Sequence, residues 1–292
     1  MKVLVTGATG FVALHLIPAL IDGGHDVLAC GHDESRLDRY PVASRVVVDL
    51  RDRTLASQLP TRIDAVIHLA QGNVGFPDAF ADLWEVNAGS TARLLDWARR
   101  AGARSFVFAS TGSVYGPGER PWCEDDPVAG AGAYAATKVA AERIVGAFAP
   151  HMSTVTLRLF GPYGAGQRGR LVPGLVGRVL RGDAVSLRDG GRPRINPVWI
   201  GDVVKVFIAS LQLGGNHTVN LAGEEILSIR DMATIIGEVA NRVPVFDEVP
   251  GSSGGDTVGD TARLRELIGN GPFVPFRDGV ASVVADILAT PR

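Results

Sequence analysis

The sequence predicts an α/β fold in which a doubly wound parallel sheet is followed by a smaller C-terminal lobe. Short runs of apolar, often β-branched residues alternate with helical windows along the first half of the chain. These runs are almost continuously apolar, which is typical of parallel strands covered by helices on both faces. After residue 160 the chain changes to turns rich in glycine and proline and to shorter segments. Its 292 residues suit one large domain or two unequal ones.

Each element is expected where its pattern of apolar residues begins and ends. Period-3.6 spacing predicts a helix over Phe11–Gly23, and Gly102 and Pro150 end two later helices. The expected strands are Lys2–Thr6, Asp26–Cys30, Arg45–Val48, Ala65–Leu69, Ser105–Ala109, Thr154–Leu159 and Val219–Leu221. The other expected helices are Phe80–Ala101, Ala133–Phe148, Leu171–Arg181, one within Val198–Leu213, and Ile229–Val239.

The charge and the cysteines exclude several classes of protein. Lysine and arginine number 29 and aspartate and glutamate 31, which gives a net charge of −2, and no block of five like charges occurs. We therefore expect neither nucleic-acid nor membrane-surface binding. Cys30 and Cys123 form no disulfide framework and no metal-ligand cluster, so we expect a reducing compartment and no metal. The apolar stretch 3–21 lacks a cleavage site, which favours a cytoplasmic protein.

A glycine turn between the first strand and the first helix predicts a dinucleotide site. The segment Thr6–Ala13 reads Thr-Gly-Ala-Thr-Gly-Phe-Val-Ala, with Ala13 at the position where a third glycine often stands. Such a turn lets the backbone approach a pyrophosphate at a helix N-terminus. The residues expected to contact the cofactor there are Gly7, Thr9, Gly10, Phe11 and Val12.

The residues after the second strand bear on the choice between NAD and NADP. An acid at that point holds the ribose 2′-hydroxyl of NAD, whereas basic groups accommodate the 2′-phosphate of NADP. The strand tip carries no acid, and His32 and Arg36 leave room and positive charge, which favours NADP. Asp33 could instead bend back to the ribose, and Arg36 could simply be solvated. Asp49-Leu50 follows the third strand and is placed to meet the adenine, although a plain turn is an equal alternative.

A tyrosine and a lysine at helical spacing predict the reaction centre. Tyr134 and Lys138 are four residues apart on one expected helix and therefore share a face. A positive charge nearby favours the phenolate, which would make Tyr134 a proton carrier near neutral pH. The hydroxyl-rich segment 110–116 follows the fifth strand, at the sheet edge where ligands bind in such folds. A hydroxyl there could bond both a substrate oxygen and Tyr134.

These segments together resemble the extended short-chain dehydrogenase/reductase superfamily, in particular its nucleotide-sugar epimerase/dehydratase group. The resemblance runs over almost the whole chain and implies a Rossmann-type fold. The matching motifs are Thr6–Phe11, Asp64–Ala70, Glu85–Ser90, Ser110–Gly116, Tyr134-x-x-x-Lys138, Arg158–Gly164, Asp202–Val204 and Asn220–Gly223.

The resemblance also implies roles for single residues. Thr111, Tyr134 and Lys138 would form the catalytic triad, and Asn87 would order the active-site helix and a proton relay. Leu69, Ala70, Asn87, Tyr134 and Lys138 would contact the cofactor. His68, inside an apolar strand, is expected to be a satisfied core histidine. The substrate contacts implied are Thr111, Gly112, Ser113, Tyr134, Gly161 and Arg194.

The resemblance favours an NAD(P)-dependent epimerase that oxidises and re-reduces the hydroxyl of a nucleotide sugar. Dehydratases of this family carry an Asp-Glu pair where this chain has Gly112 and Ser113, which argues against dehydration. Arg194 would grip the substrate diphosphate, whereas Gly161 replaces an asparagine that commonly contacts it. An NADPH-dependent reductase of a keto sugar or related carbonyl, and a non-catalytic dinucleotide sensor, are the alternatives.

The expected organisation follows from the same assignment. Residues 1–160 would bind the dinucleotide, with 196–222 returning to that domain, while 161–195 and 223–292 would bind substrate. The helices Phe80–Ala101 and Ala133–Phe148 are expected to pair in a homodimer. Small side chains that would permit close packing there are Ala135, Ala136, Ala140 and Ala141.

Overall fold

The computed structural model describes residues 1–40, 44–72, 77–252, 254–269 and 273–289. The chain forms two compact units. The first comprises Met1–Val114, Val128–Arg158 and Val204–Val219, and the second comprises Tyr115–Pro127, Leu159–Val203 and Asn220–Arg292. The returning segment in the first unit is thus shorter than the expected 196–222, and the excursion 115–127 belongs with the second unit.

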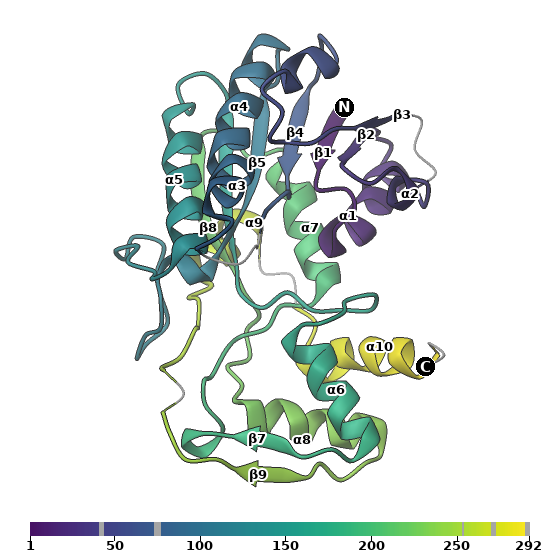
Figure 1. Cartoon of the computed structure of the whole chain (residues 1–292), viewed down its shortest axis with the longest axis vertical. Coiled ribbons are helices and arrows are strands. Elements are labelled where there is room, and N and C mark those ends of the chain that lie inside the picture. The colour runs from purple at the N-terminus through teal and green to yellow at the C-terminus, as the bar shows by residue number, and fades with distance from the viewer. Residues whose placement is uncertain (41–43, 73–76, 253, 270–272, 290–292) are drawn as a thin grey trace. The chain divides into compact units, whose positions relative to one another are not determined.

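The described part of the chain contains one seven-stranded sheet, in the order β3-β2-β1-β4-β5-β6-β8 (Figure 1). Its strands are β1 Lys2–Thr6, β2 Asp26–Gly31, β3 Ser44–Val47, β4 Ala65–His68, β5 Ser105–Thr111, β6 Ser153–Leu159 and β8 Asn216–Leu221. The pairs from β3 to β5 are parallel, and Thr6 lies opposite both Cys30 and His68. The segments that follow these strands therefore meet at one edge of the sheet.

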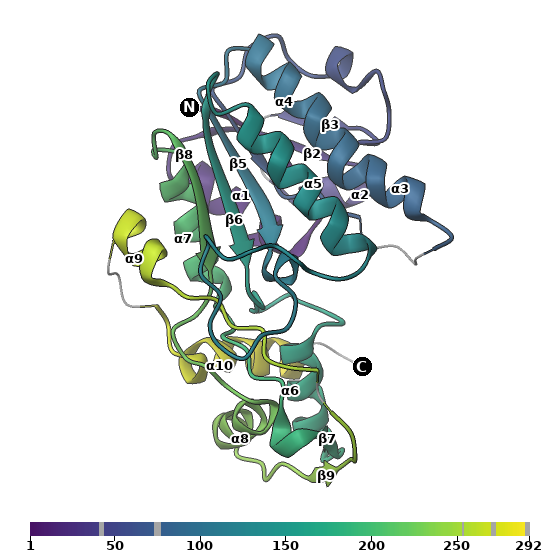
Figure 2. The same ribbon diagram turned by 90° about the vertical axis from the view of Figure 1, so that its left-hand side faces the viewer.

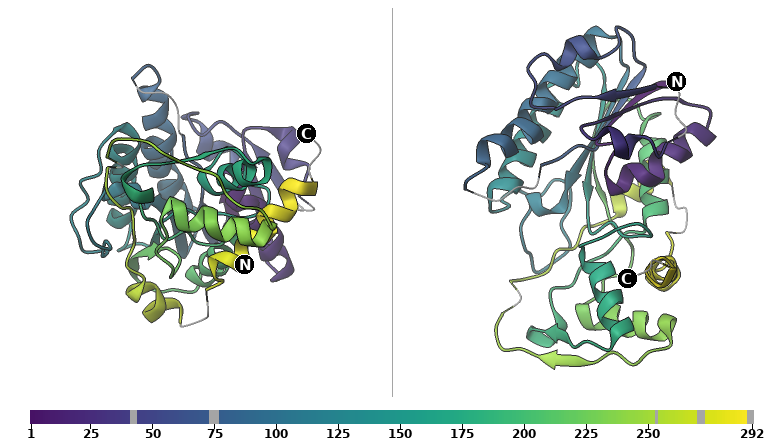
Figure 3. Two further views of the ribbon diagram at one scale, coloured as in Figure 1. Left: turned by 90° about the horizontal axis from the view of Figure 1, so that it is seen from below. Right: turned by 45° about the vertical axis from the view of Figure 1, so that its right-hand side comes forward.

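Helices cover both faces of this sheet, as the apolar strands require. The helices α1 (Phe11–Asp22) and α4 (Ser90–Arg100) lie on opposite faces, and α5 (Ala133–Ala147) lies beside α4 (Figures 1–3). Strand β4 is fully buried, and Leu94, Leu95 and Ala98 of α4 pack with it in one apolar core. Two short helices, α2 (Glu34–Leu37) and α3 (Phe80–Trp84), lie at the loops, and α7 spans Ile200–Ser210.

The expected helix Phe80–Ala101 is interrupted, so this prediction was only partly correct. A π-helical turn at Glu85–Gly89 separates α3 from α4. Such turns add one residue to the helical cycle and often occur at functional sites. Here the turn contains the buried Asn87.

The second unit has its own apolar core. Its helices are α6 Leu171–Arg181, α8 Ile229–Ala240, α9 Ala262–Ile268 and α10 Phe276–Ala289, and β7 Val185–Leu187 pairs in parallel with β9 Phe246–Glu248. The apolar faces of α6, α8 and α10 meet around Val176, Ile236 and Val283. Among the described residues, no helix has the length and apolar character needed to cross a membrane.

Candidate active site

The glycine turn after β1 is held so closely that a side chain at Gly7 does not fit. Gly7 has a φ of +69°, and a Cβ added there would lie 2.7 Å from the backbone nitrogen of Ala70. The N–H of Gly10 donates to the carbonyl of Gly7 at 2.9 Å, and the hydroxyl of Tyr40 donates to the carbonyl of Ala8 at 2.5 Å. The turn is therefore fixed by a hydrogen bond within it and by Tyr40, which follows α2 (Glu34–Leu37). Tyr40 carries no sequence signal for this role.

This turn fits the diphosphate of a dinucleotide. Helix α1 begins after Gly10 with no side chain capping it and no acid in its first turn. The N–H groups at this helix end, in the segment carrying Phe11 and Val12, suit an anion electrostatically. Thr9 lies against Gly31 at the end of β2, where an added Cβ would come within 2.9 Å of the Thr9 methyl group. These contacts place the predicted phosphate-binding residues together.

A buried histidine connects the turn to the helical side of the site. The hydroxyl of Thr91 donates to the carbonyl of Asn87 at 2.7 Å, so it accepts from His68 Nε2 at 3.0 Å. His68 Nδ1 is then the acceptor for the hydroxyl of Thr6, 2.6 Å away. Thr6 Oγ1 in turn accepts the N–H of Ala70 at 3.4 Å. His68 is fully buried, which confirms the expected satisfied core histidine, and burial lowers its pKa to about 3, helped by the Lys138 charge.

After β2, the carboxylate of Asp33 and the guanidinium of Arg36 form an ion pair. Asp33 accepts the hydroxyl of Ser35 at 2.7 Å and the N–H of Arg36 at 3.4 Å. Its carboxylate also lies 3.4 Å from Arg36 Nε. The hydrogen bond from Ser35, with smaller contributions from Arg36, lowers the pKa of Asp33, so this carboxylate is ionised at neutral pH. The positive character inferred from His32 and Arg36 is thereby reduced.

The Asp49-Leu50 segment after β3 is anchored to the helices on its side of the unit. Asp49 accepts two hydrogen bonds from Arg51 Nε, at 3.1 and 3.0 Å, and Arg51 Nη1 lies 3.1 Å from Asp82 of α3. Arg93 of α4 donates to the carbonyl of Leu50 at 2.8 Å. The position of this segment at the predicted adenine end is therefore fixed by two arginines that the sequence did not single out.

Lys138 lies in the core of the first unit beneath the end of β5. Its Nζ donates to the carbonyl of Ala109 at 2.6 Å and stands 4.1 Å from the ring centroid of Phe108. Burial lowers its pKa to about 7, although the charge of Glu142 acts in the opposite direction. From the sequence, Lys138 was interpreted as a positive charge that favours the Tyr134 phenolate. Burial disfavours that charged form.

The end of β5 presents the hydroxyls expected near the reaction. Thr111 Oγ1 donates to Ser113 Oγ at 3.2 Å and accepts the N–H of Ser113 at 3.2 Å, across a short 3-10 turn that begins at Gly112. Ser110 points to the other side and bonds Glu142 of α5 at 2.5 Å. Glu142 forms a buried ion pair with Arg158 of β6 at 2.7 Å. Strand β5, helix α5 and strand β6 are thus locked together beside these hydroxyls.

Asn87 connects the π-helical turn to α5, in line with its implied ordering role. Its Oδ1 accepts the N–H of Gly72 at 2.7 Å, and its Nδ2 donates to Thr137 Oγ1 at 2.9 Å. The hydroxyl of Thr137 then donates to the carbonyl of Tyr134 at 2.8 Å. One buried amide therefore fixes the first turn of α5 relative to the loop after β4.

The phenol of Tyr134 meets a residue that the sequence did not reveal. Its Oη donates to Oε1 of Gln71 at 2.6 Å. Gln71 follows Ala70 directly and lies 63 residues from Tyr134 along the chain. No local pattern marks such a pair, because only the folded sheet and α5 bring the two side chains together.

Two of the predicted substrate residues, Gly161 and Arg194, belong to the second unit. Gly161 adopts a φ of +53°. The backbone N–H and Nε of Arg194 both donate to Asp256 at 2.8 Å, and Arg192 Nη2 donates to the same carboxylate at 2.9 Å. Asp256 is buried, so it holds two guanidinium groups that are themselves partly exposed. The sequence did not indicate this carboxylate.

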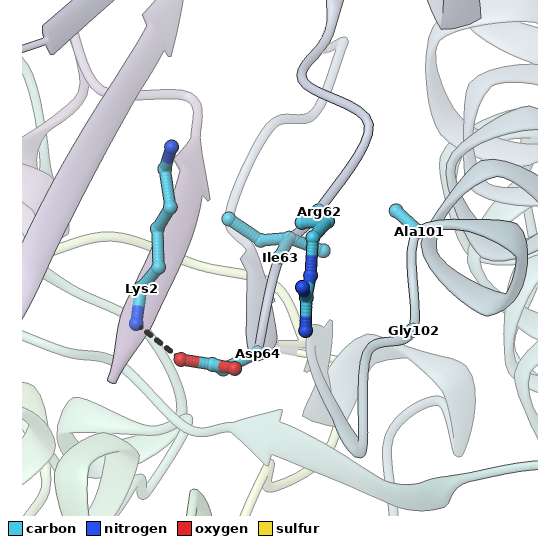
Figure 4. A pocket seen from close by; sticks show the side chains of 6 residues that line it. All are labelled: Lys2, Arg62, Ile63, Asp64, Ala101 and Gly102. Atoms are coloured by element: carbon cyan, nitrogen blue, oxygen red, sulfur yellow. Dashed lines mark hydrogen bonds between the residues drawn. The ribbon is translucent and has the colours of Figure 1, made fainter.

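The first unit also contains a pocket that does not include the predicted site residues. It is lined by Lys2, Arg62, Ile63, Asp64, Ala101 and Gly102 (Figure 4). Lys2 begins β1, and its backbone N–H donates to Asp64, just before β4, at 2.7 Å. The pocket therefore lies at the amino ends of these strands, whereas the predicted site follows their carboxyl ends.

Comparisons with known proteins show the family of this chain. The model of the NAD dependent epimerase/dehydratase family matches residues 3–222. A UDP-glucose 4-epimerase of Azospirillum brasilense is 29% identical, with 100% of this chain and 92% of that protein covered. The solved structure of MoeE5 in complex with UDP-glucuronic acid and NAD is 27% identical, with a TM-score of 0.85 and 99% of each chain covered. The complex of the Thermus thermophilus UDP-glucose 4-epimerase with NAD is 25% identical, with a TM-score of 0.83 and 100% of each chain covered.

Proposed function

Because this chain belongs to the NAD-dependent epimerase/dehydratase family, we propose that it is an NAD-dependent epimerase of a UDP-sugar. The observation that carries the proposal is the position of Tyr134, whose phenol and main chain are both held by hydrogen bonds at the carboxyl edge of the sheet. Lys138 is one helical turn away and is fixed to β5. The similar proteins with UDP-sugar in their names supply the substrate class.

In the proposed reaction, Tyr134 takes the proton from a sugar hydroxyl and later returns it. NAD, when bound, would supply the hydride acceptor and donor for that carbon. The proposal assigns to the hydroxyl of Thr111, which contacts Ser113, a hydrogen bond to the reacting oxygen. Gly112 and Ser113 supply neither the acid nor the base that elimination of water requires, so the proposed chemistry ends with re-reduction.

We propose NAD rather than NADP as the cofactor. The sequence favoured NADP because β2 carries no acid at its tip, but the similar structures do not support that preference, since they hold NAD. The carboxylate of Asp33, which is ionised and paired with Arg36, supports NAD. A 2′-phosphate brought near Asp33 would meet a like charge.

We expect the purified chain to interconvert UDP-glucose with its 4-epimer, or UDP-glucuronic acid with its 4-epimer, without net use of cofactor. Proton NMR of the sugar anomeric signals measures the product. Chromatography of the nucleotides released on denaturation should show NAD at a large excess over NADP. Stoichiometric oxidation of NADPH or NADH without an epimer would instead identify a reductase and overturn the proposal.

We also propose that two chains pair through the α4–α5 side of the first unit. Of the four alanines expected to permit close packing, Ala135 and Ala141 are buried within their own chain, whereas Ala136 and Ala140 face outward or are half-buried. Trp84 of α3 is also exposed, at 42%. Light scattering should give a mass about twice 30.7 kDa. Ala140→Glu should yield the monomer, and a monomeric wild type would refute the pairing.

In the second unit, we propose that Asp256 presents Arg194 to the substrate diphosphate. Asp256 fixes the guanidinium through Nε at 2.8 Å and lies 2.7 Å from Nη2, so the remaining nitrogen, Nη1, can carry charge toward an anion. Cys30 and Cys123 are both free thiols, which suits the cytoplasmic location that we propose.

A further inference from the structure

We propose that Gln71 is the hydrogen-bond partner that accompanies Tyr134 through both of its protonation states during catalysis. The inference rests on the proposed function, because it gives a role to a residue at the same site. Its basis is the 2.6 Å contact between Tyr134 Oη and Gln71 Oε1.

The backbone on both sides of Gln71 is fixed, although its side chain is exposed. On one side, Ala70 lies against the glycine turn, where an added Gly7 Cβ would come within 2.7 Å of its nitrogen. On the other side, Gly72 donates to Asn87 Oδ1 at 2.7 Å and accepts from Asn87 Nδ2 at 3.3 Å. The backbone that carries the Gln71 side chain is therefore held in place, and only the side-chain torsions determine whether the amide reaches the phenol.

The same asparagine also fixes the other partner. Asn87 Nδ2 donates to Thr137 Oγ1, and the hydroxyl of Thr137 donates to the carbonyl of Tyr134. A closed ring of contacts thus runs from the Tyr134 phenol through Gln71, Gly72, Asn87 and Thr137 back to the Tyr134 main chain. A ring closed in this way sets the distance between phenol and amide, as expected of a built contact.

The chemistry of a carboxamide suits this position. Its oxygen accepts the O–H of the phenol, and its NH₂ group, after rotation of the amide, donates to the phenolate. Gln71 can therefore remain bonded when the proton passes from the sugar hydroxyl to Tyr134 Oη and when it returns. Gln71 gains and loses no proton. A hydrogen bond to the charged form is the stronger of the two, so Gln71 favours the phenolate.

The elements packed against α5 carry several charged groups. The turn at Glu85–Gly89, α3, α4, β5 and the 3-10 turn all pack against α5. Their acids are paired with arginines: Glu85 with Arg93, Asp82 with Arg51, and Asp96 with Arg99 and Arg100. Lys138 is buried, with its pKa lowered to about 7. Gln71 is in direct contact with the phenol, and after rotation of its amide the NH₂ group can donate to the phenolate.

The test is a direct titration of Tyr134 in the NAD-saturated protein. The chain has four tyrosines, so ¹³Cζ-labelled tyrosine gives a simple spectrum, and Tyr134→Phe identifies the signal of interest. We expect Gln71→Leu to raise the titration midpoint of Tyr134 by about one pH unit. Gln71→Glu should raise it further, because it adds a like charge. Gln71→Lys should lower it, because it can only donate.

Controls separate this role from a structural one and from the proposed function. Gln212→Leu, another exposed glutamine in the first unit, should leave the midpoint unchanged. The other three tyrosine signals report whether each variant is folded. A Tyr134 midpoint in folded Gln71→Leu equal to that of the wild type would overturn the role of Gln71. The titration needs no sugar, so a failure to epimerise UDP-sugars would leave this result intact.

Discussion

Tyr134→Phe is expected to reduce the turnover of UDP-sugar by about 10²–10⁴-fold. The variant removes one oxygen, the atom that donates to Gln71 at 2.6 Å. Without it the sugar hydroxyl has no positioned proton acceptor when hydride leaves its carbon. The aromatic ring remains, and so do the contacts of the Tyr134 carbonyl with Thr137. The loss should therefore appear in kcat with little change in the amount of NAD that co-purifies.

A second tyrosine provides the matched control. Tyr163 belongs to the second unit, and its hydroxyl lies 3.5 Å from the carbonyl of Phe276, at the limit of a hydrogen bond. Tyr163→Phe removes the same atom and should retain most of the wild-type turnover. If Tyr134→Phe keeps more than about a tenth of the activity, the proton moves by another route.

The elements that the sequence predicted best are those specified locally. Leu171–Arg181 was predicted with its observed bounds, because its apolar spacing is clear and Gly182 follows in the left-handed conformation. The strands of the sheet agree to within about two residues at each end, except that β8 begins three residues before the predicted Val219, since short buried runs are continuously apolar. The glycine turn was also specified locally. Its sequence spans eight residues and directly joins β1 to α1.

The features that the sequence did not predict depend on contacts between distant segments. The π-helical turn at Glu85–Gly89 accompanies the bonds of Asn87 to Gly72 and Thr137. The pairing of β7 with β9 joins two three-residue strands from different parts of the chain. Neither has a periodicity of its own, so only tertiary structure defines it.

The charges of the site show the same limit. Sequence spacing correctly places Tyr134 and Lys138 within one turn of α5, but it contains no information on burial. Lys138 is fully buried, and this desolvation lowers its pKa to about 7. Arg36 was considered as a source of positive charge near the cofactor ribose, and in the structure Asp33 pairs with it across a single helical turn. Charge at a site must therefore be judged from its partners as well as from residue type.

His68 is expected to make the folded chain sensitive to acid well above the pKa of its carboxylates. Its pKa is about 3 in the folded state and 6.5 in the unfolded state, so the unfolded chain binds a proton first as the pH falls. The contribution of the neutral histidine to stability is complete above pH 6.5 and is lost as the pH falls toward about 3. At about 1.4 kcal/mol for each pH unit, the full loss is about 5 kcal/mol.

This loss is a large fraction of the stability of an ordinary domain, about 5–15 kcal/mol. Urea unfolding at neutral pH and near pH 4.5 should show a wild-type loss that exceeds that of His68→Gln by about 2–3 kcal/mol. The glutamine side chain cannot be protonated in this range, so the loss of stability of His68→Gln at acid pH comes from the other titratable groups alone. His151→Gln, which removes an exposed histidine, should behave like the wild type. If His68→Gln loses as much stability as the wild type between the two pH values, His68 titrates normally. The hydrogen-bonded connection from Thr6 to Thr91 would then tolerate a charge.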